Sequence, residues 1–408
     1  MTTYRMTACV LLIAVCVLAG CGGSQTTASN PTPSPSPTTP PSTPPPPGTP
    51  LPPSFPTEFV YTADASTITS FKINSDGSLS APVTAATVAL PEIVKGLGTS
   101  LITNSGLFAV NPATGALQLQ DSQPFFFTDA VTDIFPDPSG VTFHGNSSLA
   151  LHFPPLNSFS IATGHVALVQ QITGGQGWFQ MLASDPEGKF VYTANQPGGN
   201  LVGFNTLLAV LPRNADGTVV GTPVQASARP MCSQGVSSIS GAALTVKGTH
   251  TVLYHICAFP DELGYTTIDN ATGMIINSAN LSIPGGPFPL HASETVAVDP
   301  SSTSLLVVNS AAKTVDVYGL DQNGVPGAQP VSRTAPGMAP LNVHVDATGQ
   351  YVYVLATSCA TNASNPRPGC SDNGQVFGYK LSGGNLSLLP GAPYKAGPSS
   401  TSMTIMKF

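Results

Sequence analysis

The chain has 408 residues, of which 40 are glycine and 41 are proline, and only 8% are charged. This composition favours many short strands joined by turns over a helical protein, and its valine, leucine and phenylalanine content excludes disorder for most of the chain. The formal net charge of −7 is dispersed along the sequence, which argues against nucleic acid as a partner.

Residues 1–20 are predicted to be a signal peptide. The apolar run Cys9 to Ala19 follows Arg5 and is shorter than the roughly 20 residues that a membrane-spanning helix needs. It ends in Leu18-Ala19-Gly20-Cys21, which resembles the lipobox of bacterial lipoproteins. In that family the cysteine thiol receives a diacylglycerol and the peptide is cut just before it, so the resemblance implies lipidation of Cys21. An ordinary secretory signal or a membrane-held tail is the alternative.

Residues 21–56 are expected to be the lipidated cysteine and a disordered linker. Ser24 to Pro56 consists almost entirely of serine, threonine, proline and glycine, a composition that favours extended polyproline II. Such a segment would hold the following domain away from the membrane, with a ligand for an SH3-type domain as the alternative. We therefore expect a protein of the bacterial cell envelope, facing the periplasm or the exterior. Gly22 after the cysteine favours an outer membrane where one is present.

Residues 57–408 repeat one phrase: an apolar strand, a turn, an aromatic-rich strand, a third strand, a glycine turn and a fourth strand. The glycine turn has seven copies, about 50 residues apart, each where a tight two-strand connection requires positive φ. The copies are Asp76-Gly77, Thr114-Gly115, Thr163-Gly164, Asp216-Gly217, Thr272-Gly273, Asn323-Gly324 and Gly383-Gly384.

A four-stranded unit of this period predicts an all-β fold, a seven-bladed β-propeller. The first copy begins at its second strand, Glu58 to Ala63, whereas the last residues, Pro398 to Lys407, read as an inner strand without a blade. Pairing of these two segments would close the ring and leave no open edge. This match between the two ends favours a propeller over a generic β-solenoid.

The repeats resemble the lactonase-type propellers, the 6-phosphogluconolactonase-like family. The resemblance rests on FVYTA at Phe59, FVYTAN at Phe190 and YVYVL at Tyr351, with third-strand endings such as VDVYGLDQNG from Val315. It covers essentially all of residues 57–408 and implies a seven-bladed propeller with a lactone-hydrolysing pocket at its axis.

In that family the inner strand typically enters as Pro-Arg-His, and the basic pair holds an anionic sugar acid. The matching triplets here are Pro340-Leu341-Asn342, Ser293-Glu294-Thr295, Phe179-Gln180-Met181 and Val131-Thr132-Asp133, none of which has the Arg-His pair. Because a phosphorylated substrate calls for several converging cations, 6-phosphogluconolactone is not the expected substrate.

The candidate catalytic residues are His344 and Glu294, and the candidate channel-lining residues are Asn342, His291, Asp133 and Gln180. His344 follows Asn342 by two positions, so both side chains should point the same way. A histidine and a carboxylate could act as base and polariser on a lactone. Alternatively, these side chains line a wet channel and satisfy one another. The remaining histidines show no metal-ligand spacing, so we expect no metal and no cofactor.

Four cysteines remain after the signal and lipidation sites, an even number suited to an oxidising compartment. Cys359 and Cys370 bracket an insertion in the last blade and are predicted to form one disulfide. Cys232 and Cys257 belong to a single blade and are predicted to form the other.

The sequence therefore predicts a monomeric, lipid-anchored envelope propeller. A binding or scaffold role for a protein or glycan at the propeller face comes first, with two insertions, Thr206 to Ala215 and Cys359 to Cys370, as variable contacts. The alternative is a hydrolase of an uncharged or weakly anionic lactone, and a purely structural surface protein is a third possibility.

Overall fold

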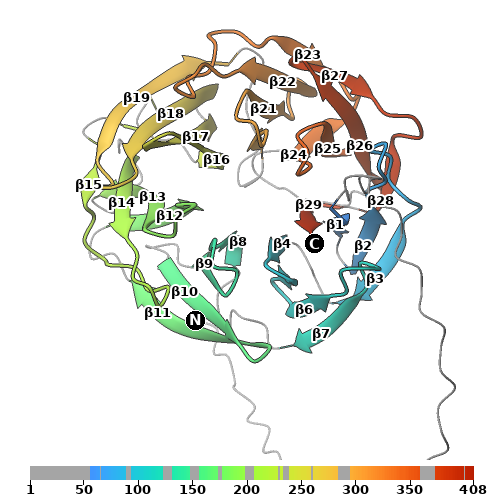
Figure 1. Cartoon of the computed structure of the whole chain (residues 1–408), viewed down its shortest axis with the longest axis horizontal. Helices are drawn as coiled ribbons and strands as arrows, with labels where there is room; N and C mark the ends of the chain where they lie inside the picture. Colours follow the sequence, from blue (N-terminus) through green and yellow to red (C-terminus); the bar gives the residue numbers. More distant parts are fainter. Residues whose placement is uncertain are drawn as a thin grey trace, which may run out of the picture. The chain divides into compact units, whose positions relative to one another are not determined.

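The strands group into seven antiparallel sheets arranged around one axis (Figure 1). The computed structural model describes residues 56–64, 66–88, 93–122, 131–147, 156–172, 177–197, 206–227, 230–232, 239–258, 261–283, 295–358, 373–398 and 400–408. Within these ranges there is no helix, and hence none that could cross a bilayer. The predicted all-β, seven-bladed propeller is confirmed.

Each of blades 1 to 4 has four strands, in the following order from the innermost outward. Blade 1 contains β29 (Ser402–Lys407), β1 (Glu58–Ala63), β2 (Thr67–Lys72) and β3 (Val83–Thr87). Blade 2 contains β4 (Val94–Leu97), β5 (Ser100–Thr103), β6 (Gly106–Val110) and β7 (Leu117–Asp121). Blade 3 contains β8 (Val131–Pro136), β9 (Thr142–Ser147), β10 (Leu156–Ala162) and β11 (His165–Ile172). Blade 4 contains β12 (Gly177–Ser184), β13 (Phe190–Pro197), β14 (Leu207–Pro212) and β15 (Gln225–Ala226).

Blades 5 to 7 follow the same order. Blade 5 contains β16 (Ile239–Lys247), β17 (His250–Ala258), β18 (Asp261–Asp269) and β19 (Ile275–Ser282). Blade 6 contains β20 (Val296–Val298), β21 (Ser304–Asn309), β22 (Thr314–Gly319) and β23 (Ser332–Thr334). Blade 7 contains β24 (Ala339–Val345), β25 (Tyr351–Thr357), β26 (Asn373–Ser382) and β27 (Asn385–Leu388), and β28 (Tyr394–Pro398) also pairs with β26.

The ring is closed by the two ends of the propeller sequence, as predicted. β29 pairs with β1 in antiparallel register from Glu58↔Lys407 to Ala63↔Ser402 and supplies the inner strand of blade 1. The predicted strand was four residues too long at its start, because Pro398 ends β28 instead. This pairing covers the edge of β1 that blade 1 would otherwise present.

The seven predicted glycine turns all connect the third and fourth strands of a blade. The glycine that ends each turn has a φ between 71° and 88°, a region that side chains with a Cβ rarely adopt. Four of these glycines, Gly77, Gly115, Gly273 and Gly324, also lie against an aromatic side chain of a neighbouring blade. Tyr61 donates its hydroxyl to the Gly115 carbonyl at 2.8 Å, and Tyr353 donates to the Gly77 carbonyl at 2.7 Å. At these interfaces the aromatic strand of one blade therefore packs against the glycine turn of the next blade.

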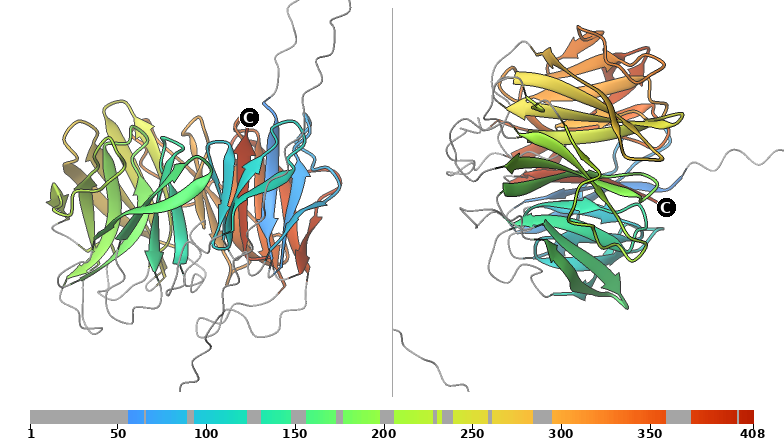
Figure 2. Two further views of the ribbon diagram at one scale, coloured as in Figure 1. Left: turned by 90° about the horizontal axis from the view of Figure 1, so that it is seen from below. Right: turned by 90° about the vertical axis from the view of Figure 1, so that its left-hand side faces the viewer.

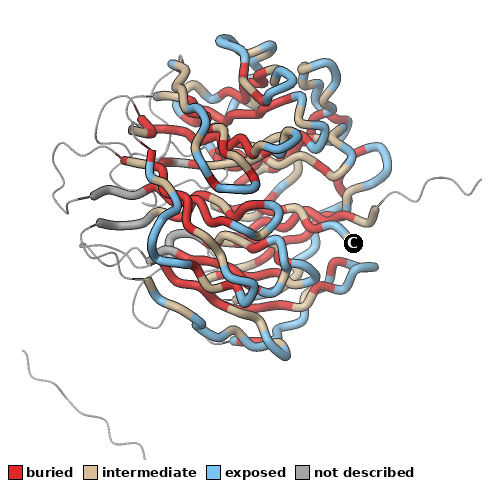
Figure 3. Tube along the Cα trace, turned by 60° about the vertical axis from the view of Figure 1, so that its left-hand side comes forward, coloured by how far each residue is buried: buried red, intermediate tan, exposed pale blue. Residues whose placement is uncertain are grey.

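The hydrophobic core is divided into seven clusters of described residues, one at each interface between neighbouring blades. Strand β25 shows the cause: Val352 and Val354 pack against blade 6, while Tyr353 and Leu355 pack against blade 1. Because successive side chains of a strand point to opposite faces, each strand serves two interfaces. Neighbouring blades run alongside one another, with burial concentrated in the strands and exposure in the outer turns (Figures 2 and 3).

The prediction of Thr206 to Ala215 as an insertion is wrong. Leu207–Pro212 is β14, the third strand of blade 4, and it pairs with β13 from Asn195↔Leu207 to Phe190↔Pro212. Four consecutive residues of this strand, from Leu208 to Leu211, are fully buried, because both of its faces lie against neighbouring blades. Such a continuous apolar run lacks the alternation by which strands are usually found.

Candidate functional site

The innermost strands of the seven blades surround the propeller axis (Figure 1). Asn342 and His344 lie on β24 and Gln180 lies on β12. Asp133 lies on β8, opposite Asn146 of β9, but its side chain is not described. His291 and Glu294 lie outside the described residues, so the predicted pairing of His344 with Glu294 stays a prediction.

Asn342 and His344 form the polar face of β24 toward blade 1. The Nε2 atom of His344, a half-buried side chain, lies 2.8 Å from the Met403 carbonyl oxygen on β29. Because a carbonyl only accepts, Nε2 carries the ring proton and Nδ1 is the basic nitrogen. Asn342 is 3% exposed, and its Oδ1 has no hydrogen-bond partner among the described residues. A buried amide oxygen of this kind is an acceptor for a hydroxyl group or a water molecule.

Other polar side chains of the inner strands hold neighbouring blades together. Gln180 donates from Nε2 to the Ile239 carbonyl on β16 at 2.7 Å, and the Val94 amide on β4 donates to Ser402 Oγ on β29 at 3.1 Å. These contacts agree with the alternative in which inner-strand polar groups satisfy one another. The contacts also show where two of the residues lie along the propeller axis. His344 contacts Met403 and Val94 contacts Ser402, which are consecutive residues of β29, so His344 and Val94 lie at nearly the same level.

Lys95 is a buried lysine of the inner strands that no sequence motif marks. It lies within β4, and its side chain is 7% exposed. Val94 packs against blade 1, whereas Leu97 packs against blade 3, so Lys95 projects from the same face as Leu97. The Asp-Pro-x-Gly-type turn that marks other inner strands is replaced after β4 by Leu97-Gly98, which is why alignment on that turn passed over Lys95.

The seven inner strands contain no arginine, and their lysines are Lys95, Lys247 and Lys407, the last two at strand ends. The two arginines of the described ranges are used elsewhere. Arg213 forms a buried ion pair with Asp137, with Nε 2.6 Å from Oδ2, and Arg333 donates two bonds to the Asp316 carboxylate at 2.7 and 2.6 Å. The inner ring therefore lacks the converging cations that a phosphate group favours.

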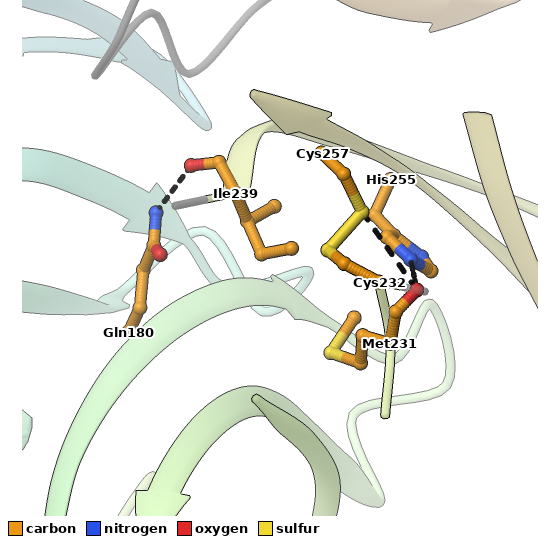
Figure 4. The surroundings of a disulfide bond; sticks show 6 residues. All are labelled: Gln180, Met231, Cys232, Ile239, His255 and Cys257. Atoms are coloured by element: carbon orange, nitrogen blue, oxygen red, sulfur yellow. Dashed lines mark hydrogen bonds between the residues drawn. A yellow bond between two sulfur atoms is a disulfide. The ribbon is translucent and has the colours of Figure 1, made fainter. Parts of the chain in front are cut away.

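Cys232 and Cys257 form a disulfide with Cα atoms 5.9 Å apart, the pair named from the sequence. It lies between blades 4 and 5, beside the buried His255 (Figure 4). Burial lowers the pKa of His255 to about 4. Cys21, Cys359 and Cys370 lie outside the described residues. No sequence pattern indicates a cluster here, because Cys232 comes from a separate segment and the spacing of His255 and Cys257 is uninformative.

No protein-family model and no curated protein matches the sequence. Solved structures do match. A candidate 6-phosphogluconolactonase from Bacteroides fragilis is 16% identical, with a TM-score of 0.62 over 87% of this chain and 99% of that chain. A protein from Lactobacillus plantarum is 13% identical, with a TM-score of 0.60 over 86% of this chain and 100% of that chain. A hypothetical selenium-binding protein from Sulfolobus tokodaii is 8% identical, with a TM-score of 0.59 over 86% of this chain and 93% of that chain.

At these identities the likeness concerns the fold. The neighbour from Bacteroides fragilis is named after the family that the sequence repeats resemble.

Proposed function

We propose that this protein is a lactone hydrolase that acts on an uncharged or singly charged sugar lactone. The observation that carries the proposal is the polar face of β24, where the oriented imidazole of His344 neighbours the buried Oδ1 of Asn342, an amide oxygen without a partner among the described residues. The likeness to a candidate 6-phosphogluconolactonase supports the same reaction class. Together these findings favour the lactonase alternative over the surface-binding role that the sequence placed first.

Hydrolysis of a lactone needs a base for the attacking water and a group that stabilises charge on the carbonyl oxygen. In the proposed mechanism His344 Nδ1 takes a proton from water as the water oxygen bonds to the carbonyl carbon. The ring C–O bond then breaks, the ring oxygen receives that proton from His344, and the open hydroxy acid leaves. Lys95 supplies positive charge to the same ring of strands, and Asn342 accepts a hydroxyl of the sugar.

The charge of the inner ring supports the choice of substrate. The inner strands have one lysine in a strand interior, two at strand ends and no arginine, a set that suits a neutral lactone or one carboxylate better than a phosphate ester. We further propose that the enzyme is exported and held at a bacterial membrane through lipid on Cys21, supported by the Leu18–Cys21 motif. For this part, Cys21→Ser is expected to release the protein from membranes, and retention would contradict it.

The test is a panel of lactones assayed by acid release at constant pH. Sugar δ-lactones with no charge should be hydrolysed faster than their spontaneous rate, and 6-phosphorylated lactones should be poorer substrates. Spontaneous rates throughout the panel would contradict the proposal, and the surface-binding role would then become the leading hypothesis.

A further inference from the structure

A second site lies away from the inner strands, in a cavity of about 240 Å³ between blades 4 and 5. Its walls come from β14, β17, β18 and β19 and from the segment that precedes β16. The lining combines polar and sulfur-containing side chains, namely Ser227, Met231, Cys232, His255, Ser278 and Asn280. The proposed lactonase chemistry uses none of them.

His255 is held in one orientation in this cavity. Its Nε2 atom lies 2.8 Å from the Met231 carbonyl oxygen, which requires the proton on Nε2 and leaves the lone pair on Nδ1. His255 is 1% exposed, and Nδ1 has no hydrogen-bond partner among the described residues. The residue opposite on β18 is Gly264, where a Cβ atom would lie 2.0 Å from Nε2. The glycine therefore makes room for the ring.

Two sulfur atoms complete the arrangement (Figure 4). Cys257 follows His255 by two positions on β17, so both side chains project from the same face. Cys232 follows Met231, whose carbonyl orients the imidazole and lies 3.7 Å from Cys257 Sγ. The two Sγ atoms and a ring nitrogen of His255 all lie within 4.8 Å of one another, and all three residues are buried.

We propose that this site binds a zinc ion when the Cys232–Cys257 disulfide is reduced, and releases it when an oxidised dithiol accepts two electrons from the cysteines and the disulfide forms again. A dithiol reductant attacks the sulfur of Cys232, which lines the cavity, and Cys257 leaves as a thiolate. The second thiol of the reductant then displaces Cys232, so the reductant becomes a disulfide and the protein gains two electrons and two protons. Zinc binding to Cys232, Cys257 and His255 displaces the two thiol protons into solution.

The donor set fits zinc in particular. Two thiolates and one imidazole are ligands that zinc accepts in tetrahedral sites, and three protein ligands leave a fourth position open. The cavity adjoins Cys232 and His255, so that position can be taken by water or by a small ligand. The hydrogen bond from Nε2 to a backbone carbonyl is the contact that metal-binding histidines usually make through their other nitrogen.

The experiment compares zinc binding by the oxidised and the reduced protein. Cys9, Cys16, Cys21, Cys359 and Cys370 are replaced by serine in the background, so that only the Cys232–Cys257 pair can respond. Zinc alone is the probe, measured by equilibrium dialysis and elemental analysis, with cobalt(II) absorption as a report on thiolate ligation. The reduced protein should bind about one zinc ion per chain with release of about two protons, and the oxidised protein should bind none.

Single substitutions test whether zinc binding depends on the proposed ligands. His255→Gln should weaken zinc binding at least about tenfold. Cys257→Ser removes one thiolate ligand, so the cobalt(II) absorption that arises from ligation by both thiolates should disappear. His250→Gln, on the same strand, is the matched control and should bind zinc like the parent. Zinc should also raise the melting temperature of the reduced parent, because a ligand that binds only the folded state stabilises it.

Several results would overturn the proposal. The first is that the reduced protein binds no zinc. The second is that zinc binding is equal before and after reduction. The third is that Cys257→Ser leaves the zinc affinity of the reduced protein unchanged. A reduced parent that shows no cooperative unfolding transition, with or without zinc, would also contradict it.

Discussion

Two histidines of this propeller make the same hydrogen bond in different surroundings. His344 and His255 each place Nε2 2.8 Å from a backbone carbonyl, that of Met403 and that of Met231. His344 is half-buried on an inner strand, whereas His255 is 1% exposed between two blades. The carbonyl fixes the tautomer in both cases, so the surroundings decide the chemistry. A half-buried imidazole can exchange protons with water, and a buried neutral one beside two sulfurs is a ligand for a soft metal ion.

The largest expected difference between the surroundings of His255 and His344 comes from reduction of the disulfide beside His255. Its cysteines are 25 residues apart, and a loop of this size corresponds to about 3 kcal/mol of stability on the chain-entropy model. In the background with Cys359→Ser and Cys370→Ser, reduction without zinc should lower the free energy of unfolding by about that amount, measured with urea. Lactone hydrolysis per folded molecule should stay the same, because His344 belongs to another interface. A loss of activity that exceeds the loss of folded protein would show that the two regions are coupled.

A third histidine tests the effect of burial without neighbouring sulfur atoms. His144 on β9 is fully buried, with Nδ1 3.0 Å from Ser158 Oγ, and burial lowers its pKa from 6.5 to about 4. The unfolded state therefore binds the proton more readily. The contribution of His144 to stability should be complete above about pH 6.5 and should fall by about 3 kcal/mol as the pH drops to about 4. The measurement is urea unfolding across this pH range. Burial lowers the pKa of His255 to about 4 as well, so His144→Gln should lessen the fall by about 3 kcal/mol and leave the part that His255 contributes. An unchanged profile would contradict this assignment.

The space around His255 can be probed from the opposite strand. Gly264→Ala places a Cβ atom against Nε2 and should displace the ring, at a cost of about 2 kcal/mol in stability. Zinc affinity of the reduced protein should fall at the same time. Gly248→Ala is unsuitable as a control because its φ is 60°, so Gly221→Ala, where the nearest atom lies at 3.6 Å, serves instead. Equal stabilities of the two variants would contradict the close packing of the ring.

The smallest effect is expected beside His344. Tyr353 lies opposite His344 on β25 and donates its hydroxyl to the Gly77 carbonyl of blade 1. Tyr353→Phe removes this hydrogen bond and should cost about 1 kcal/mol or somewhat more, since the carbonyl is left without its donor. The readout is the melting temperature. Tyr351→Phe is the matched control, because the hydroxyl of Tyr351 makes a long 3.4 Å contact to an exposed carbonyl.

The repeated features of the fold were predictable from the sequence, and the functional features only in part. Positive φ at Gly77 and its six equivalents follows from local chemistry, and the period of the aromatic strands follows from the repeat. Lys95 escaped prediction because its blade lacks the usual turn after the inner strand. The cluster of Cys232, His255 and Cys257 depends on a carbonyl from a separate segment, which no spacing rule contains. Strand β14 was mistaken for an insertion because burial on both faces removes the alternating pattern.

The central claim is that His344 acts as the base in lactone hydrolysis, and one pair of variants tests it most directly. The measurement is kcat/KM for an uncharged sugar δ-lactone in the parent, in His344→Gln and in His250→Gln. A general base contributes about a hundredfold or more to the rate, so His344→Gln should lose at least that much while it keeps its melting temperature within a few degrees. His250→Gln should match the parent. Equal kcat/KM in a folded His344→Gln variant would contradict the account.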